Sequence, residues 1–164
     1  YEISTSQGIE LDISYALADN LFLDITGSSM TAETNTDIES LGASKGDRLP
    51  NTVEKQYNIG LTYEYSSPLM GLASFVRADY LYYGDSFATF EQSESMFSPD
   101  YTKINVNWGM EIDANNSIQL SIDNLTDERT EAFKYSVNSP SWRPRDYMQW
   151  IPPRTITFAY RYNY

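Results

Sequence analysis

The chain has 164 residues, of which 41% are apolar and 15% aromatic, and its net charge is -12 with neither cysteine nor histidine present. A chain without these two residue types has no thiol nucleophile, disulfide, zinc-finger site or Ser-His-Asp triad, so we expect no enzyme activity, metal or cofactor. The acidic balance also excludes nucleic acid as a partner, because binding to phosphates requires a basic surface.

An all-β fold is predicted, because apolar and polar residues alternate with a period of two through most of the chain, and no stretch approaches the roughly 20 apolar residues of a membrane-spanning helix. The first strand covers residues 8–17 and extends in the same register back to residue 1. A tight turn at 18–20 leads to a second strand at 21–32. Residues 33–52 then lose the alternation and gather glycine and proline, which indicates a long loop.

Five further strands are predicted, at residues 53–65, 72–84, 103–112, 117–123 and 154–164. The connections between them are short turns at 66–71 and 113–116, and long irregular segments at 85–100 and 126–153. The strand at 72–84 has the weakest alternation, because Phe75 and Leu81 fall on its polar face. Short and long connections therefore alternate strictly along seven strands.

The last strand has the most aromatic apolar face of the seven. Its apolar positions are Ile156, Phe158, Tyr160, Tyr162 and Tyr164. A strand whose outer face meets lipid, with tyrosines at the level of the headgroups, has this pattern. The polar face of such a strand is directed inward, to an aqueous or plugged lumen.

The alternation of connection lengths and the charges agree with transmembrane β-barrel strands in the bacterial outer membrane. In such barrels the short turns lie in the periplasm and the long loops outside. On the apolar registers, the lysine and arginine residues are Lys55 and Arg154, each shortly after a long loop. Both are expected at the outer rim, where a charge facing lipid costs about 0–1 kcal/mol, against about 2–4 kcal/mol at the midplane.

Two groups of residues resemble the C-terminal end of TonB-dependent outer-membrane receptors. One is Asp123-Asn124-Leu125-Thr126-Asp127-Glu128-Arg129, followed by a long loop and by Pro153-Arg154-Thr155 at the start of the terminal strand. The other is Gly46-Asp47-Arg48-Leu49-Pro50, which is similar to the Gly-x-x-Leu-Pro loop before a strand in that family. The chain departs from the family pattern at Tyr164, where phenylalanine is usual, and in lacking a second proline after Pro50.

This resemblance implies a barrel of about 22 strands with a plugged lumen, to which residues 1–164 contribute the last seven strands and no plug domain. It further implies an active transport receptor for a scarce nutrient such as a siderophore, cobalamin or a glycan. The implied partners are outer-membrane lipid, the TonB complex through a plug absent from this chain, the barrel-assembly machinery, and a small-molecule or oligosaccharide ligand.

Candidate ligand-binding residues lie in the long segment at 126–153, and they are Trp142, Arg143, Arg145 and Trp150. Arginine offers a fork of donors for carboxylates, and tryptophan offers a face on which rings stack. The alternative is that these side chains only pack their own loop. Asn124 and Asp127 are expected to form a strand-exit turn, and Arg77 and Asp79 to pair with other lumenal groups or with a plug.

The aromatic residues of the last strand are a candidate assembly signal for the barrel-assembly machinery, and they are Phe158, Tyr160, Tyr162 and Tyr164. A girdle of aromatic residues at the membrane interface is a compatible alternative.

Two other functions stay open at this point. One is a small passive barrel of eight strands, if a further strand lies in or before residues 1–6. The other is a soluble β-sandwich that binds carbohydrate, with Trp142 and Trp150 stacking on sugar rings.

Overall fold

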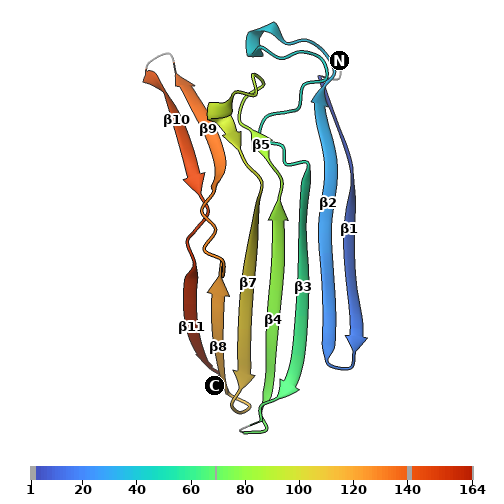
Figure 1. Ribbon diagram of the computed structural model, residues 1–164, viewed down its shortest axis with the longest axis vertical. Coiled ribbons are helices and arrows are strands. Elements are labelled where there is room, and N and C mark those ends of the chain that lie inside the picture. Colours follow the sequence, from blue (N-terminus) through green and yellow to red (C-terminus); the bar gives the residue numbers. More distant parts are fainter. Residues whose placement is uncertain (1–2, 69, 140–141, 164) are drawn as a thin grey trace.

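The computed structural model describes residues 3–68, 70–139 and 142–163, and it describes 137–139 and 142–144 by their backbone alone. Its main element is a seven-stranded antiparallel sheet in which neighbours in space are neighbours in the chain (Figure 1). The strands, in spatial order, are β1 (Ser4–Ala18), β2 (Leu21–Thr34), β3 (Lys55–Ser66), β4 (Ala73–Tyr83), β7 (Tyr101–Glu111), β8 (Asn116–Asp123) and β11 (Thr155–Tyr162). The predicted all-β class and the seven strands are confirmed.

Short and long connections lie at opposite ends of this sheet. The turns that join β1 to β2, β3 to β4 and β7 to β8 lie at the lower end in Figure 1, and the long connections lie at the upper end. The upper connections contain η1 (Glu39–Leu41), β5 (Ser86–Phe87), η2 (Glu94–Met96) and β6 (Phe97–Ser98). In the part of the chain that the structure describes, no helix is long and apolar enough to cross a membrane.

The prediction of an irregular segment at 126–153 was wrong, because this segment forms a hairpin outside the main sheet. Its strands are β9 (Glu131–Ser139) and β10 (Trp142–Trp150), which pair with each other and stand beyond the upper ends of β8 and β11 (Figure 1). Register shifts occur between Trp142 and Arg145 and between Gln149 and Trp150. These irregularities break the period of two on which the prediction relied.

The main sheet has one apolar and one polar face, in the predicted registers. Large side chains of the apolar face are exposed along its length, among them Ile9, Leu11, Ile13, Tyr15, Ile59, Leu61, Tyr63, Tyr80, Ile156 and Phe158. Among the described residues, the buried apolar ones are Ala32, near the end of β2, Ala43 and Met96, in the long connections after β2 and β4, and Ile151, just after β10. The sheet therefore has no core of its own, and its apolar face requires another apolar medium.

The two apolar residues on the polar face of β4 have a local explanation. Phe75 pairs with Gly109 of β7, and a Cβ added at Gly109 would lie 2.3 Å from the Phe75 ring. Phe75 thus covers a glycine, which leaves space for the ring against the backbone. Leu81 lies beside Tyr83 in the lining of a hollow on the polar face. The weak alternation of this strand therefore reflects packing on the polar face and not a change of register.

Candidate functional site

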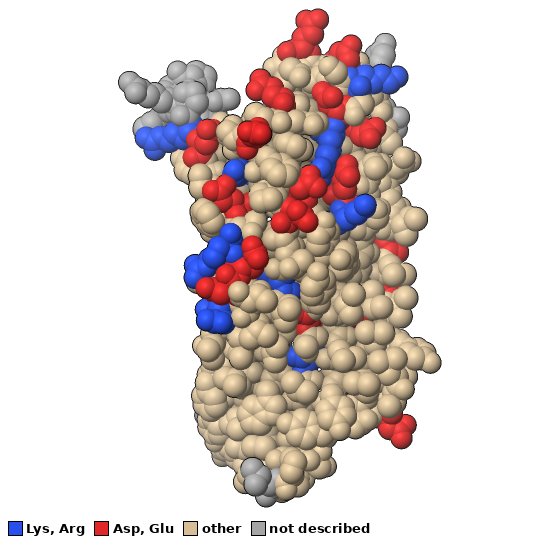
Figure 2. Space-filling model, viewed as in Figure 1, with Lys and Arg blue, Asp and Glu red and all other residues tan. Residues whose placement is uncertain are grey.

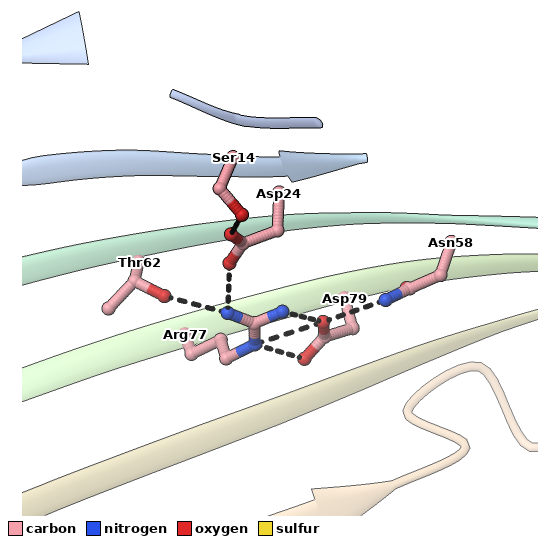
Figure 3. Close-up of polar contacts among 6 residues, drawn as sticks. All are labelled: Ser14, Asp24, Asn58, Thr62, Arg77 and Asp79. Atoms are coloured by element: carbon pink, nitrogen blue, oxygen red, sulfur yellow. Dashed lines mark hydrogen bonds and ion pairs between the residues drawn. The ribbon is translucent and has the colours of Figure 1, made fainter. Parts of the chain in front are cut away.

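A network of charged and polar side chains joins four strands at the centre of the polar face. Arg77 of β4 donates from Nη1 to Asp24 Oδ2 of β2 at 2.7 Å and to Thr62 Oγ1 of β3 at 3.1 Å (Figure 3). Its Nε and Nη2 donate to the Asp79 carboxylate at 2.8–3.0 Å. Ser14 of β1 donates its hydroxyl to Asp24 Oδ1 at 2.9 Å. Every carboxylate oxygen of the Asp24 and Asp79 pair thus accepts a hydrogen bond.

A glycine makes this arrangement possible. Gly60 of β3 pairs with both Asp24 and Asp79, and a Cβ added at Gly60 would lie 2.2 Å from Nη2 of Arg77. The guanidinium therefore lies across the Gly60 backbone, where the Cβ of a larger residue would displace the Arg77 side chain. Arg77 and Asp79 were expected to pair with other groups on the polar face or with a plug. In the structure, Arg77 pairs with Asp24 and Asp79 within the sheet.

Two hollows flank this network on the polar face. The upper hollow has a volume of about 500 Å³ and includes Glu10, Asp12 and Asn58 in its lining. The lower hollow, nearer the short turns, has a volume of about 560 Å³ and includes Glu64 and Glu111. Both are open depressions whose charged side chains are all carboxylates.

A second arginine ties two of the long connections together. Arg48, from the Gly46 to Pro50 motif, donates from Nη1 to Asp85 Oδ2 at 2.9 Å and from Nη2 to the Thr52 carbonyl at 2.6 Å. The Asn51 N–H donates to the Phe87 carbonyl at 2.7 Å. The motif therefore joins the connection after β2 to the connection after β4. On the face that Figure 2 shows, charged side chains gather over the upper half, where these connections lie.

Asn124 forms the turn at the end of β8, and its side chain bonds the local backbone as predicted from the sequence. It has a φ of 54°, and it is 1% exposed. Its Nδ2 donates to the carbonyls of Glu128 and Pro152 at 3.0 Å, and its Oδ1 accepts from the Glu128 N–H at 2.9 Å. Asparagine tolerates this left-handed conformation and bonds the local backbone at the same time. The side chain thus holds both ends of the segment that carries the β9–β10 hairpin.

Asp127 holds the start of the last strand from the same turn. Its carboxylate accepts from the Arg154 N–H at 2.9 Å and from Arg129 Nη2 at 3.0 Å. These two contacts, the backbone N–H first, lower the pKa of Asp127 below its usual value. A lowered pKa in the folded state stabilises the turn above the unfolded-state pKa near 4, and this contribution is lost as the pH falls through the folded value.

We expect Asn124→Ala to loosen the β9–β10 hairpin from the sheet. The substitution removes three partly buried hydrogen bonds, each of which contributes on the order of 0.5–1.5 kcal/mol. Limited proteolysis of the folded protein should then show faster cleavage in 126–153. Gln119→Ala, at an exposed position of β8, is the matched control and should cleave at the original rate. Equal rates for the two variants would contradict a holding role for Asn124.

The candidate ligand-binding residues all belong to β10 of the hairpin. Arg145 and Trp150 are exposed. Arg145 shares the β10 face of Tyr147 by alternation, whereas a register shift between Gln149 and Trp150 interrupts the alternation before Trp150. Trp142 and Arg143 also belong to β10, and their side chains lie outside the described residues. Of these four residues, the structure describes the side chains of Arg145 and Trp150, and it places Arg145 on the face of Tyr147.

Three aromatic residues of the hairpin were missed from the sequence. Tyr135 stacks on Tyr147 across the two strands, with ring centroids 4.9 Å apart, and Phe133 lies 5.8 Å from Tyr135. All three residues are about 40% exposed. Phe133 and Tyr135 alternate with Lys134 and Ser136, and this short period of two was the signal that could have revealed them. Together with Arg145 they form the aromatic face of the hairpin.

The proposed assembly-signal residues lie on an edge strand. Phe158, Tyr160 and Tyr162 share the apolar face of β11 and are all exposed. Tyr160 donates its hydroxyl to Asn116 Oδ1. Tyr164 lies outside the described residues.

A family model described as TonB dependent receptor-like, beta-barrel matches residues 2–125. The solved structure of the ferric yersiniabactin uptake receptor FyuA from Yersinia pestis has a TM-score of 0.78 and 18% identity, over 98% of this chain and 24% of that chain. The siderophore receptor PiuA from Acinetobacter baumannii has a TM-score of 0.75 and 19% identity, over 98% and 22%. BauA, the ferric preacinetobactin receptor from the same organism, has a TM-score of 0.72 and 12% identity, over 97% and 22%. No curated protein sequence matches the chain.

These comparisons agree with the geometry of the two faces. The chain spans about a quarter of the length of the solved receptors, and its sheet follows their fold. The apolar face is the lipid-facing side of a barrel wall in the bacterial outer membrane, and the polar face lines the lumen. The matching family consists of transport receptors and not of enzymes. Because the family model covers well over half of its residues, the chain belongs to the TonB-dependent receptor β-barrel family.

Proposed function

We propose that residues 1–164 form the C-terminal part of the barrel of an outer-membrane receptor that imports a scarce nutrient with energy supplied through TonB. The observation that carries this proposal is a membrane wall with two open edges. Among the described strands, β1 pairs with β2 alone and β11 pairs with β8 alone. An unpaired backbone group in lipid costs several kcal/mol, so both edges need further strands, as in a barrel of about 22 strands.

The remaining parts of the transport cycle belong to segments outside this chain. A plug inside the lumen would close the barrel and would carry the segment that contacts TonB. The present wall would supply the lumenal face and three of the outer loops. Phe158, Tyr160, Tyr162 and Tyr164 would present the aromatic face of the last strand to the barrel-assembly machinery.

A ferric siderophore is the proposed nutrient, and the hairpin is its proposed contact. The solved neighbours FyuA, BauA and PiuA are siderophore receptors, which favours this class over cobalamin and glycans. The aromatic face offers stacked rings beside the guanidinium of Arg145, a combination suited to a ligand with planar rings and carboxylate groups. Trp142, Arg143 and Trp150 would extend this contact along β10.

Uptake by cells that express the intact receptor tests the proposal. Import of iron-55 from a panel of siderophores should occur with TonB and stop in a strain without TonB. Tyr147→Ala combined with Arg145→Ala should raise the Kd for the imported siderophore roughly tenfold or more, with the amount of folded receptor unchanged. Gln92→Ala, in another outer loop, is the control.

Two results would contradict this function. Uptake that persists without TonB would favour the passive barrel. A receptor that purifies without detergent would favour the soluble β-sandwich, although the described strands form one open main sheet without a second sheet packed on it.

A further inference from the structure

The β9–β10 hairpin requires support from outside its own two strands. Among the described strands, β9 and β10 pair only with each other, and an isolated two-stranded hairpin is marginally stable in water. Asn124 holds the base of the hairpin. Farther along, β6 is the described element outside the hairpin that makes the most extensive contact with it, through β9. The position of the hairpin therefore depends on the position of β6.

The strand β6 in turn depends on β5. These two short strands pair with each other, and the Ala88 N–H extends the pairing by donating to the Met96 carbonyl at 2.9 Å. The rings of Phe87 and Phe97 lie 5.0 Å apart. Short linkers join β4 to β5 and β6 to β7, so the pair is attached to the main sheet without being part of it. Contacts with a further segment are needed to fix its direction.

The connection after β2 supplies these contacts through Arg48 and Asn51. Arg48 donates from Nη1 to Asp85 Oδ2 at 2.9 Å, directly before β5, and from Nη2 to the Thr52 carbonyl at 2.6 Å. The Asn51 N–H donates to the Phe87 carbonyl at 2.7 Å. The planar fork of the guanidinium thus bonds both connections at once. The Arg48 side chain is only 16% exposed, so water competes little for these hydrogen bonds.

The strands of the wall do not depend on this arginine. Arg48 lies outside the seven strands of the main sheet, whose ladder hydrogen bonds hold them together. The side chains of its acidic partners, Glu54 and Asp85, are 44% and 43% exposed, so water can solvate their carboxylates when the cation is removed. Loss of Arg48 should therefore loosen the outer connections and leave the wall folded.

We propose that Arg48 is a positioning residue for ligand binding, because it fixes β5 and β6, on which the β9–β10 hairpin rests. This inference rests on the proposed function, because it takes the aromatic face of the hairpin as the ligand contact. A binding surface that is held in place before the ligand arrives loses less conformational entropy on binding. Arg48 therefore raises the affinity for a ligand that it does not touch.

Hydrogen–deuterium exchange of the intact receptor in detergent, without ligand, tests the support of the hairpin. Peptides from residues 131–139 and 145–150 should exchange faster in Arg48→Met than in the parent receptor, by roughly threefold or more. Lys45→Met is the matched control. It removes an exposed lysine of the same connection whose side chain makes no ion pair among the described residues, and the hairpin should then exchange at the parent rate.

Binding measurements test the positioning role itself. The probe is the ferric siderophore that cells import in the iron-55 uptake test. Arg48→Met should raise its Kd by roughly threefold to thirtyfold, with the amount of folded receptor and its Tm unchanged, whereas Lys45→Met should retain the parent Kd. Asp85→Ala is a second variant, which removes the acceptor of Arg48 Nη1. It should accelerate exchange in the hairpin and raise the Kd in the same direction.

The outcomes separate this inference from the proposed function. Exchange at the parent rate in the hairpin of both Arg48→Met and Asp85→Ala would overturn the inference and leave TonB-dependent uptake untouched. Faster exchange with an unchanged Kd would also overturn it, because Arg48 would then have a structural role only. An absence of TonB-dependent uptake would contradict the proposed function and the role in binding together, whereas the exchange rates would still decide whether Arg48 supports the hairpin.

Discussion

Ile122→Arg should remove most of the folded receptor from the outer membrane, whereas Ser121→Arg should leave it in place. Ile122 lies on the lipid-facing side of β8, paired with Val106 and Ile156. Val106 pairs with Ala78 at the middle of β4, and Ile156 is the next lipid-facing position after Arg154, so Ile122 lies between the outer rim and the midplane. The cost of an arginine facing lipid there lies between the rim value of about 0–1 kcal/mol and the midplane value of about 2–4 kcal/mol.

Ser121 is the matched control for this prediction. It is the neighbour of Ile122 on the same strand, and its side chain points to the lumen, where an arginine meets water. Folded barrel can be measured by its faster migration on gels before heating, in outer membranes prepared from cells. If both variants gave equal amounts of folded receptor, the assignment of the lipid-facing side would be wrong.

Arg77→Met should lower the apparent Tm of the receptor, because it leaves the carboxylates of Asp24 and Asp79 without their cation. Removing one partner of a fully buried ion pair costs about 3–5 kcal/mol. The Asp79 side chain is 14% exposed and that of Asp24 is 33% exposed, so water compensates in part. We therefore expect a loss on the order of 1–3 kcal/mol.

A rescue variant distinguishes the lost charge pairing from lost packing. Arg77→Met combined with Asp24→Asn and Asp79→Asn should recover most of the lost Tm, because the network then contains no carboxylate that lacks its cation. Arg161→Met removes a lumenal arginine that has no ion pair among the described residues, and it should change the Tm little. Equal losses for Arg77→Met and Arg161→Met would contradict a structural role for the network.

Most of the wall could be read from the sequence because strand alternation is local. Each side chain of a strand points away from the next, so Leu61 and Thr62 reveal their faces without any knowledge of their neighbours. The pairing of consecutive strands could also be predicted, since strands joined by a short turn are antiparallel neighbours. The strand-exit role of Asn124 was also recognised, because its local backbone hydrogen bonds follow from the residue type.

The β9–β10 hairpin could not be read in the same way. Its pairing is interrupted between Trp142 and Arg145 and again before Trp150, so the alternation is too short to stand out. The predicted ligand residues of this segment stay a prediction, and the stacked rings of Phe133, Tyr135 and Tyr147 depend on a pairing that only the fold reveals.

The sequence by itself determined the class of the protein, the faces of its strands and the depth of its charges, because these depend on residues one or two positions apart. Only the tertiary structure decided which charged side chains form ion pairs. Asp24 and Arg77 are distant in the chain and meet because β2, β3 and β4 pair in one register, over the space left by Gly60. Among the described residues, the same registers bring no cation within ion-pair distance of Glu10, Asp12, Glu64 and Glu111. An ion pair requires atoms within about 4 Å, and pairing between strands sets the position of each partner.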